Sequence, residues 1–215
     1  SYIPTGPFFV IMVYCVYRAL ESEARRKLFI LLGGILYGLL FYLYFYFWVF
    51  ATIFLGILFL IFLVTKRYPE AKTIFLAGLV GVLVSIPFWV NQYYLSALPS
   101  YEDIIARVGV EEGYGVRWFL WNTYILFFAM AGAALWVGRK FQRVNLGYFL
   151  AAIALSGFFA YNVNIFTGFT IQSDHWGNKV FLITNGLILP PLLYFAWLSL
   201  SPFLRKKLSF NEKKL

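Results

Sequence analysis

Seven long apolar segments follow one another along the chain, separated by stretches that hold most of its charged residues. A transmembrane helix needs about 20 consecutive, mainly apolar residues, and each segment comes close to that length. The pattern therefore predicts an all-α protein, a polytopic transmembrane helix bundle of about seven spans that forms a single domain over residues 1–215. The predicted spans are 3–20, 28–44, 47–64, 73–91, 118–138, 146–166 and 180–201.

The second and third spans form one uncharged stretch from Leu28 to Thr65, which is too long for a single ordinary span. Basic residues stand at both of its ends. Cytoplasmic loops carry an excess of Lys and Arg, and only a hairpin of two spans puts both basic ends on the same side of the membrane. We therefore expect a turn within the aromatic run from Tyr42 to Trp48, at the opposite membrane interface.

The distribution of Lys and Arg predicts the orientation of the bundle. Alternating spans place fourteen of the 18 basic residues in cytoplasmic stretches, whereas the outer loops at 92–117 and 167–179 hold only Arg107, Arg117 and Lys179. This asymmetry predicts that both long loops are extracytoplasmic and that the C-terminus is cytoplasmic.

Composition narrows the class of protein further. The chain is 62% apolar and 13% charged, whereas a soluble domain carries about 25% charged residues, so a soluble enzyme is excluded. The same values exclude intrinsic disorder. The basic residues that give the net charge of +9 lie mainly in the loops between spans. Membrane lipids and not nucleic acids are therefore the predicted partners. The single cysteine, Cys15, lies in an apolar run and can form no internal disulfide.

Small residues and prolines predict how the spans pack. Gly34-x-x-x-Gly38 puts two glycines on one helix face, which permits close contact with another helix. Pro87 and the pair Pro190–Pro191 are expected to kink their helices. The backbone carbonyls freed by a proline can be bound by neighbouring helices.

The first outer loop contains a predicted surface helix. Ser100 with Asp103 resembles a capping box, and Gly109 resembles a helix stop, so 101–108 should form a short helix lying on the membrane surface. This helix can be a solvated connector with an apolar underside. A functional interpretation rests on arginine, whose planar guanidinium matches phosphate oxygens. On that interpretation the lipid-phosphate-binding residues are Arg107, Arg117 and Lys179.

The second outer loop gathers amides, hydroxyls, an acid, the only histidine, a tryptophan and a lysine. A tryptophan ring covers the apolar face of a sugar while polar groups bond its hydroxyls. The loop is therefore predicted to line a sugar or acceptor pocket, with a membrane-interface anchor as the alternative for His175 and Trp176. One His beside one Asp does not show a metal-ligand spacing, so no metal site is predicted. The predicted substrate-binding residues are Asn164, Gln172, Asp174, His175 and Trp176.

Two stretches carry a resemblance to a family. A span with the run from Gly34 to Trp48 leads straight into another span, and the run from Asn164 to Trp176 contains Thr-Gly followed by Gln-Ser-Asp-His-Trp. Together they resemble bacterial membrane proteins of the GT-C glycosyltransferase type. The resemblance implies an enzyme of the bacterial cytoplasmic (inner) membrane that takes a sugar from a polyprenyl-phosphate-linked donor, with its active site facing away from the cytoplasm.

The chain departs from this family in one respect. The GT-C pattern places a catalytic acid in the first outer loop of the full protein, and none of Glu102, Asp103, Glu111 and Glu112 matches that position. No catalytic residue is therefore assigned. Because the sequence opens at Ser1 without an initiator methionine, the chain is expected to be the C-terminal part of a longer protein.

The leading functional hypothesis is the membrane portion of a polyprenyl-phosphate-sugar-dependent glycosyltransferase. A non-catalytic membrane subunit and a transporter of lipid-linked or small polar substrates stay open as alternatives. A transporter would need ionisable residues within its spans, and the predicted spans hold essentially only Arg18, near one end. No cofactor is predicted, although a divalent cation at the lipid phosphate is an open alternative.

Overall fold

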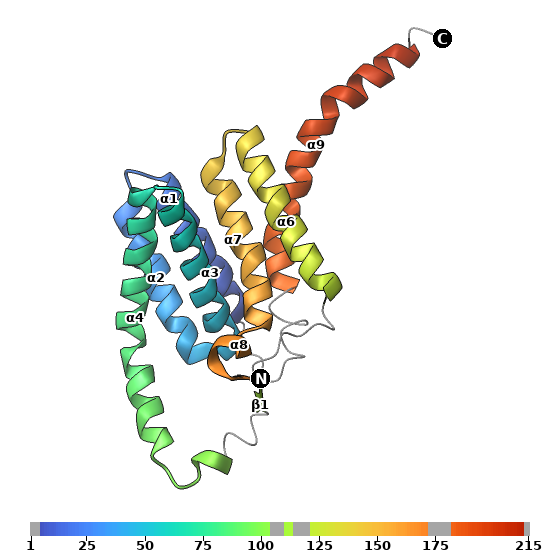
Figure 1. Ribbon diagram of the computed structural model, residues 1–215. Coiled ribbons are helices and arrows are strands. Elements are labelled where there is room, and N and C mark those ends of the chain that lie inside the picture. Colours follow the sequence, from blue (N-terminus) through green and yellow to red (C-terminus); the bar gives the residue numbers. More distant parts are fainter. Residues whose placement is uncertain (1–4, 104–109, 114–120, 172–181, 213–215) are drawn as a thin grey trace.

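The computed structural model of the protein describes residues 5–103, 110–113, 121–171 and 182–212 (Figure 1). Helices make up almost all of this part, so the predicted all-α class is confirmed. The helices are α1 (Thr5–Glu21), α2 (Arg26–Leu43), α3 (Phe45–Val64), α4 (Tyr68–Ser96), α6 (Trp121–Lys140), α7 (Val144–Tyr161), α8 (Asn164–Thr167) and α9 (Leu182–Glu212). Two short strands, β1 (Val110–Glu112) and β2 (Phe169–Ile171), were not predicted.

Six helices of the described part are long and apolar enough to cross a membrane, namely α2, α3, α4, α6, α7 and the Leu182–Ser201 part of α9. The seventh long helix, α1, has 17 residues and lies against α2. Large apolar side chains point outward from the bundle, and Leu60, Leu83 and Leu193 are 57%, 56% and 67% exposed. A protein that is soluble in water rarely exposes so much apolar surface. The chain is a multi-pass integral membrane protein.

The bundle is built around α3 and α7, which pack against each other. α3 contributes a row of fully buried side chains, including Phe50, Phe54 and Phe62. The Phe54 ring meets the Phe149 ring of α7 edge to face, with 5.1 Å between centroids. α4 packs against α2 and α3, and α6 packs against α7. The core is therefore the seam between two groups of helices (Figure 1).

The bundle has two chemically different ends (Figure 1). We call the end that holds the α1–α2, α3–α4 and α6–α7 turns the basic end, because these turns carry the arginines and lysines. We call the opposite end, with the α2–α3 turn, α8 and the two strands, the outer end. α9 starts at the outer end and continues past the other helices at the basic end (Figure 1).

The turn between α2 and α3 consists of Tyr44 alone, whose φ of −159° and ψ of 124° are those of extended backbone. A turn within the aromatic run is therefore confirmed. The two helices share a stacked pair of rings, Phe41 and Trp48, but α2 lies mainly on α1 and α4, and α3 lies mainly on α7 and α4. A single extended residue redirects the chain into a different layer of the bundle.

The two glycines of the Gly34-x-x-x-Gly38 motif make the predicted close helix contact, and the structure identifies the partner helix as α4. A Cβ atom on Gly34 would come within 2.5 Å of the Val80 Cβ, and one on Gly38 within 2.5 Å of the Val84 Cβ. Both values are far below van der Waals contact. The motif thus allows the α2 and α4 backbones to approach closely.

Pro87 lies inside α4, which continues to Ser96. The Tyr42 hydroxyl donates to the Val84 carbonyl over 2.9 Å and accepts from the Phe88 N–H over 3.2 Å. It therefore stands between the two groups that would bond each other in an undisturbed helix. The carbonyl that Pro87 itself leaves free is that of Leu83, so the predicted binding of a freed carbonyl stays a prediction, while α2 binds the backbone groups of the next residue pair.

Several predicted boundaries were wrong. α4 runs over Tyr68–Ser96 where 73–91 was expected, so the first outer loop starts after Ser96, and α7 ends at Tyr161, not at 166. The predicted span end at 201 agrees with the apolar Leu182–Ser201 part of α9, and the helix itself continues to Glu212. α4 and α9 run beyond their apolar parts because hydropathy marks only the apolar part of a helix, whereas polar residues can extend the helix further. Residues 101–103 of the predicted surface helix are helical, and 104–108 lie outside the described residues.

Candidate functional site

The structure describes one of the eight predicted binding residues. Asn164 is the first residue of α8. The others lie outside the described residues: Arg107, Arg117, Gln172, Asp174, His175, Trp176 and Lys179. The described segments that flank these residues show which contacts join the two outer loops to each other.

The two outer loops are joined by an antiparallel β ribbon at the outer end (Figure 1). β1 comes from the first loop and β2 from the second, with Val110 opposite Ile171 and Glu112 opposite Phe169. The loops are far apart in the sequence, so this pairing is a tertiary contact that neither loop makes alone. The ribbon is the centre of the candidate site.

Gly113 extends this pairing beyond the strands. Its N–H donates to the Gly168 carbonyl over 2.8 Å, and its carbonyl accepts from Asn164 Nδ2 over 2.9 Å. Gly113 has a φ of 136° and Gly168 a φ of 78°, values at which residues with a Cβ are strained. Two glycines therefore let the loops meet closely at this point.

Asn164 is 5% exposed, and its amide bridges the two outer loops through Gly113. This placement gives the side chain a structural role, because loss of the amide would leave the Gly113 carbonyl without this bond. Its predicted contact with a sugar stays a prediction.

Asn162 ties the end of α7 to α6. Its side chain is fully buried; Nδ2 donates to the Phe158 carbonyl over 2.8 Å and Oδ1 accepts from the Tyr124 hydroxyl over 3.2 Å. The side chain thereby binds a carbonyl of the last helical turn. Asn162 is the C-cap residue of α7 and holds this helix end against α6.

A cavity of about 390 Å³ lies beside α8, between α3 and α7. Its lining is almost wholly apolar: Ile53, Gly56, Ile57, Leu60, Phe159, Val163 and Phe166. A Cβ on Gly56 would meet nothing within 4 Å, so this glycine widens the groove. The cavity therefore leads from the apolar flank of the bundle to the residues next to Asn164.

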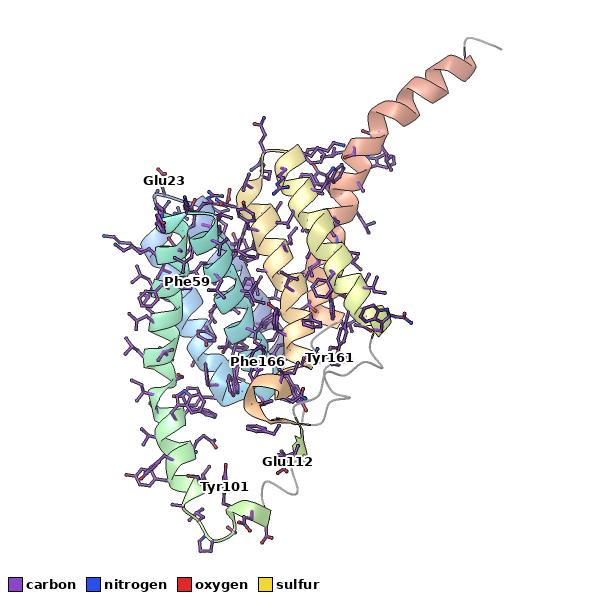
Figure 2. The ribbon with its side chains drawn as sticks, viewed as in Figure 1. Glu23, Phe59, Tyr101, Glu112, Tyr161 and Phe166 are labelled. Carbon is purple, nitrogen blue, oxygen red and sulfur yellow. The ribbon has the colours of Figure 1, made fainter. Side chains whose placement is uncertain are left out.

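Aromatic and acidic side chains surround the ribbon. Figure 2 shows Tyr161, Phe166 and Glu112 at the outer end. Phe166 is 71% exposed, and Tyr93 at the end of α4 is 74% exposed. Exposed aromatic rings in this position are typical of a membrane–water interface. These rings are therefore consistent with an interfacial position of the outer end.

Within the described ranges, no group of three or more His, Cys, Asp or Glu side chains could hold a metal ion. The sequence prediction missed the structural residues of the site, Tyr124, Asn162 and Gly113. The only local signal was an Asn at the end of an apolar span, and its partner on α6 could not be identified from the sequence.

Comparison of the chain with protein-family models, with curated proteins and with solved structures gives no match. The functional argument therefore depends on the geometry of the outer end and on the chemistry of the two loops.

Proposed function

We propose that the protein is the membrane portion of a glycosyltransferase that uses a polyprenyl-phosphate-linked sugar on the extracytoplasmic side. The observation that carries this proposal is the ribbon that joins the two outer loops. One loop holds Arg107 and Arg117, on either side of β1 in the sequence, and the other continues from β2 directly into Gln172. Residues suited to a phosphate and residues suited to a sugar thus flank one common structural element.

The apolar cavity beside α8 supports a lipid-linked donor. A polyprenyl chain is a long hydrocarbon, and it gains free energy when it lies in an apolar groove and not in water. The groove ends at Val163 and Phe166, which stand on either side of Asn164 in the sequence. A lipid chain in the groove would therefore place its phosphate near the outer loops.

The two central helices argue against a transporter. α3 and α7 contain no Asp, Glu, Lys, Arg or His, and coupled transport through a bundle uses ionisable residues within the spans. Their contact is filled instead by buried aromatic and aliphatic side chains such as Phe54 and Phe149.

Glycosyl transfer needs two kinds of group at this end. A carboxylate activates the acceptor hydroxyl as general base, and cations stabilise the charge on the departing lipid phosphate. Arg107, Arg117 and Lys179 are proposed for the second role. Asp174, His175 and Trp176 are proposed to bind the sugar or the acceptor, and the general base is not assigned to any residue of this chain.

The proposal is tested with the complete protein in proteoliposomes that contain a polyprenyl-phosphate sugar. Arg107→Ala, Arg117→Ala and His175→Ala should each reduce glycosyl transfer by about tenfold or more, because a hydrogen bond to a charged group contributes about 1.5–3 kcal/mol. Arg139→Ala, at the basic end, is the matched control and should retain full activity. Folded yield is measured for every variant. Normal transfer by all three variants would refute the proposal.

A cross-link tests the ribbon itself. In a Cys15→Ala background, Glu112→Cys and Phe169→Cys place cysteines at directly opposed positions of the ribbon, and oxidation should join them. Glu112→Cys with Thr170→Cys is the control, since adjacent strand positions face opposite sides of a ribbon. Failure of the first pair to cross-link better than the second would remove the structural basis of the site.

A further inference from the structure

The α3–α4 and α6–α7 turns at the basic end have the same backbone structure. Lys66 and Gln142 adopt positive φ values of 59° and 55°, and each is followed by an arginine that begins the next helix, Arg67 and Arg143. In both turns the arginine N–H donates over 2.8 Å to the carbonyl five residues earlier. These are Schellman motifs that use a residue other than glycine at the left-handed position.

The two equivalent arginines line one cavity. It has a volume of about 610 Å³ and lies at the basic end, where the two turns meet the end of α1. Sites for small molecules commonly have volumes of about 300–1,000 Å³. The lining residues are Glu21, Arg67, Gln142, Arg143, Val144 and Asn145.

The polar groups of this cavity have unused bonding capacity. Arg67 is paired with Glu70 and lies over the Phe62 ring, 5.7 Å from its centroid. Within the described residues, neither Glu21 nor Arg143 makes an ion pair. The Oδ1 atom of Asn145 is buried and has no hydrogen-bond partner in the same part of the chain.

The cavity lining carries charges of both signs. Arg143 and Arg67 each carry one positive charge and Glu21 carries one negative charge, while Glu70, which is outside the lining, pairs with Arg67. A purely anionic ligand would meet the Glu21 carboxylate at close range. A zwitterion with a phosphate and an ammonium group would match both arginines and the carboxylate.

We propose that this cavity binds the phosphoethanolamine headgroup of a membrane phospholipid. Arg143 and Arg67 bind the phosphate through guanidinium donors, which suit phosphate oxygens. The Glu21 carboxylate accepts hydrogen bonds from the ammonium group. The cavity lies at the ends of the spans, at headgroup depth. The site is at the opposite end of the bundle from the ribbon and does not depend on the proposed glycosyl transfer.

Native mass spectrometry of the full chain tests this site, with phosphatidylethanolamine, phosphatidylglycerol and inorganic phosphate as separate probes. We expect the wild-type protein to prefer phosphatidylethanolamine by about two- to fivefold, the ratio that corresponds to one favourable exposed charge pair. Arg143→Gln should reduce binding of both lipids. Glu21→Gln should abolish the preference by weakening phosphatidylethanolamine and strengthening phosphatidylglycerol.

Arg139→Gln is the matched control, because it removes one arginine four positions before Arg143 without touching the cavity lining. It should leave the lipid preference unchanged. Equal or tighter binding of phosphatidylglycerol by the wild-type protein would overturn the proposal. Competition by inorganic phosphate at the same concentration as the lipid would also overturn it, because that result would identify a free-phosphate site. An unchanged preference in Glu21→Gln would do the same even if Arg143→Gln failed to fold.

Discussion

At the scale of single residues, polar side chains occupy places where a membrane helix loses its own hydrogen bonds. The Tyr42 hydroxyl enters the backbone of α4 next to Pro87, and the Asn162 amide binds a carbonyl in the last turn of α7. Lipid offers no partner for an open backbone group, so each such group needs one from the protein. These two side chains therefore provide partners for backbone groups beside a helix proline and at a helix end.

Tyr42→Phe should destabilise the bundle by about 0.5–1.5 kcal/mol, because the Val84 carbonyl loses its donor and the Phe88 N–H loses its acceptor. The measurement is reversible unfolding in mixed micelles. Tyr93→Phe is the control, since Tyr93 is 74% exposed and its hydroxyl makes no bond within the described residues. Equal unfolding free energies for the two variants would show that Tyr42 does not support α4.

At the scale of helices, close contact depends on a few glycines while other glycines leave open space. A Cβ on Gly38 would lie 2.5 Å from the Val84 Cβ and 2.7 Å from the Gly81 carbonyl oxygen. A Cβ on Gly132 would meet nothing within 4 Å. Gly38 and Gly132 both lie inside long helices but differ in the space around them. Substitutions at the two positions therefore separate the effect of packing from that of helix propensity.

Gly38→Ala should destabilise the protein by about 1–3 kcal/mol, because the added methyl group forces α2 and α4 apart. Gly132→Ala should stabilise it by up to about 1 kcal/mol, since alanine favours a helix more than glycine does. Unfolding in mixed micelles measures both changes. Effects of the same sign would contradict the close contact between α2 and α4.

At the scale of the whole molecule, the basic turns lie at one end and the β ribbon at the other (Figure 1). Cations held against aromatic rings reinforce the basic end: the Lys140 ammonium lies 4.5 Å from the Trp136 ring centroid. Such side chains keep an apolar body in the membrane and a charge in water. The two ends should therefore face different compartments, with the basic end on the cytoplasmic side.

Single cysteines test this orientation in a Cys15→Ala background. A cysteine at Ser100, exposed in the first outer loop, should react with an impermeant thiol reagent in intact cells. A cysteine at Gln142, exposed in a basic turn, should react only after permeabilisation. The reverse pattern would invert the membrane orientation and would move the proposed glycosyl transfer to the cytoplasmic side.

The sequence alone determined the seven long helices of the described part, because the thickness of the bilayer fixes the length of an apolar span whatever surrounds it. It also determined the reversal near Tyr44 and the packing role of Gly34 and Gly38, since these follow from local spacing and charge. Each of these features can be read within one or two consecutive segments.

Only the tertiary structure decided where helices end and which distant residues meet. Asn164 contacts Gly113 across 51 positions of sequence, and Arg67 and Arg143 line one cavity from two separate turns. Such contacts depend on which helices pack together. Apolar faces in a membrane are nearly interchangeable as partners, because lipid and protein interiors are equally apolar. Partner choice therefore rests on close packing and on a few polar bonds, neither of which leaves a periodic pattern in the sequence.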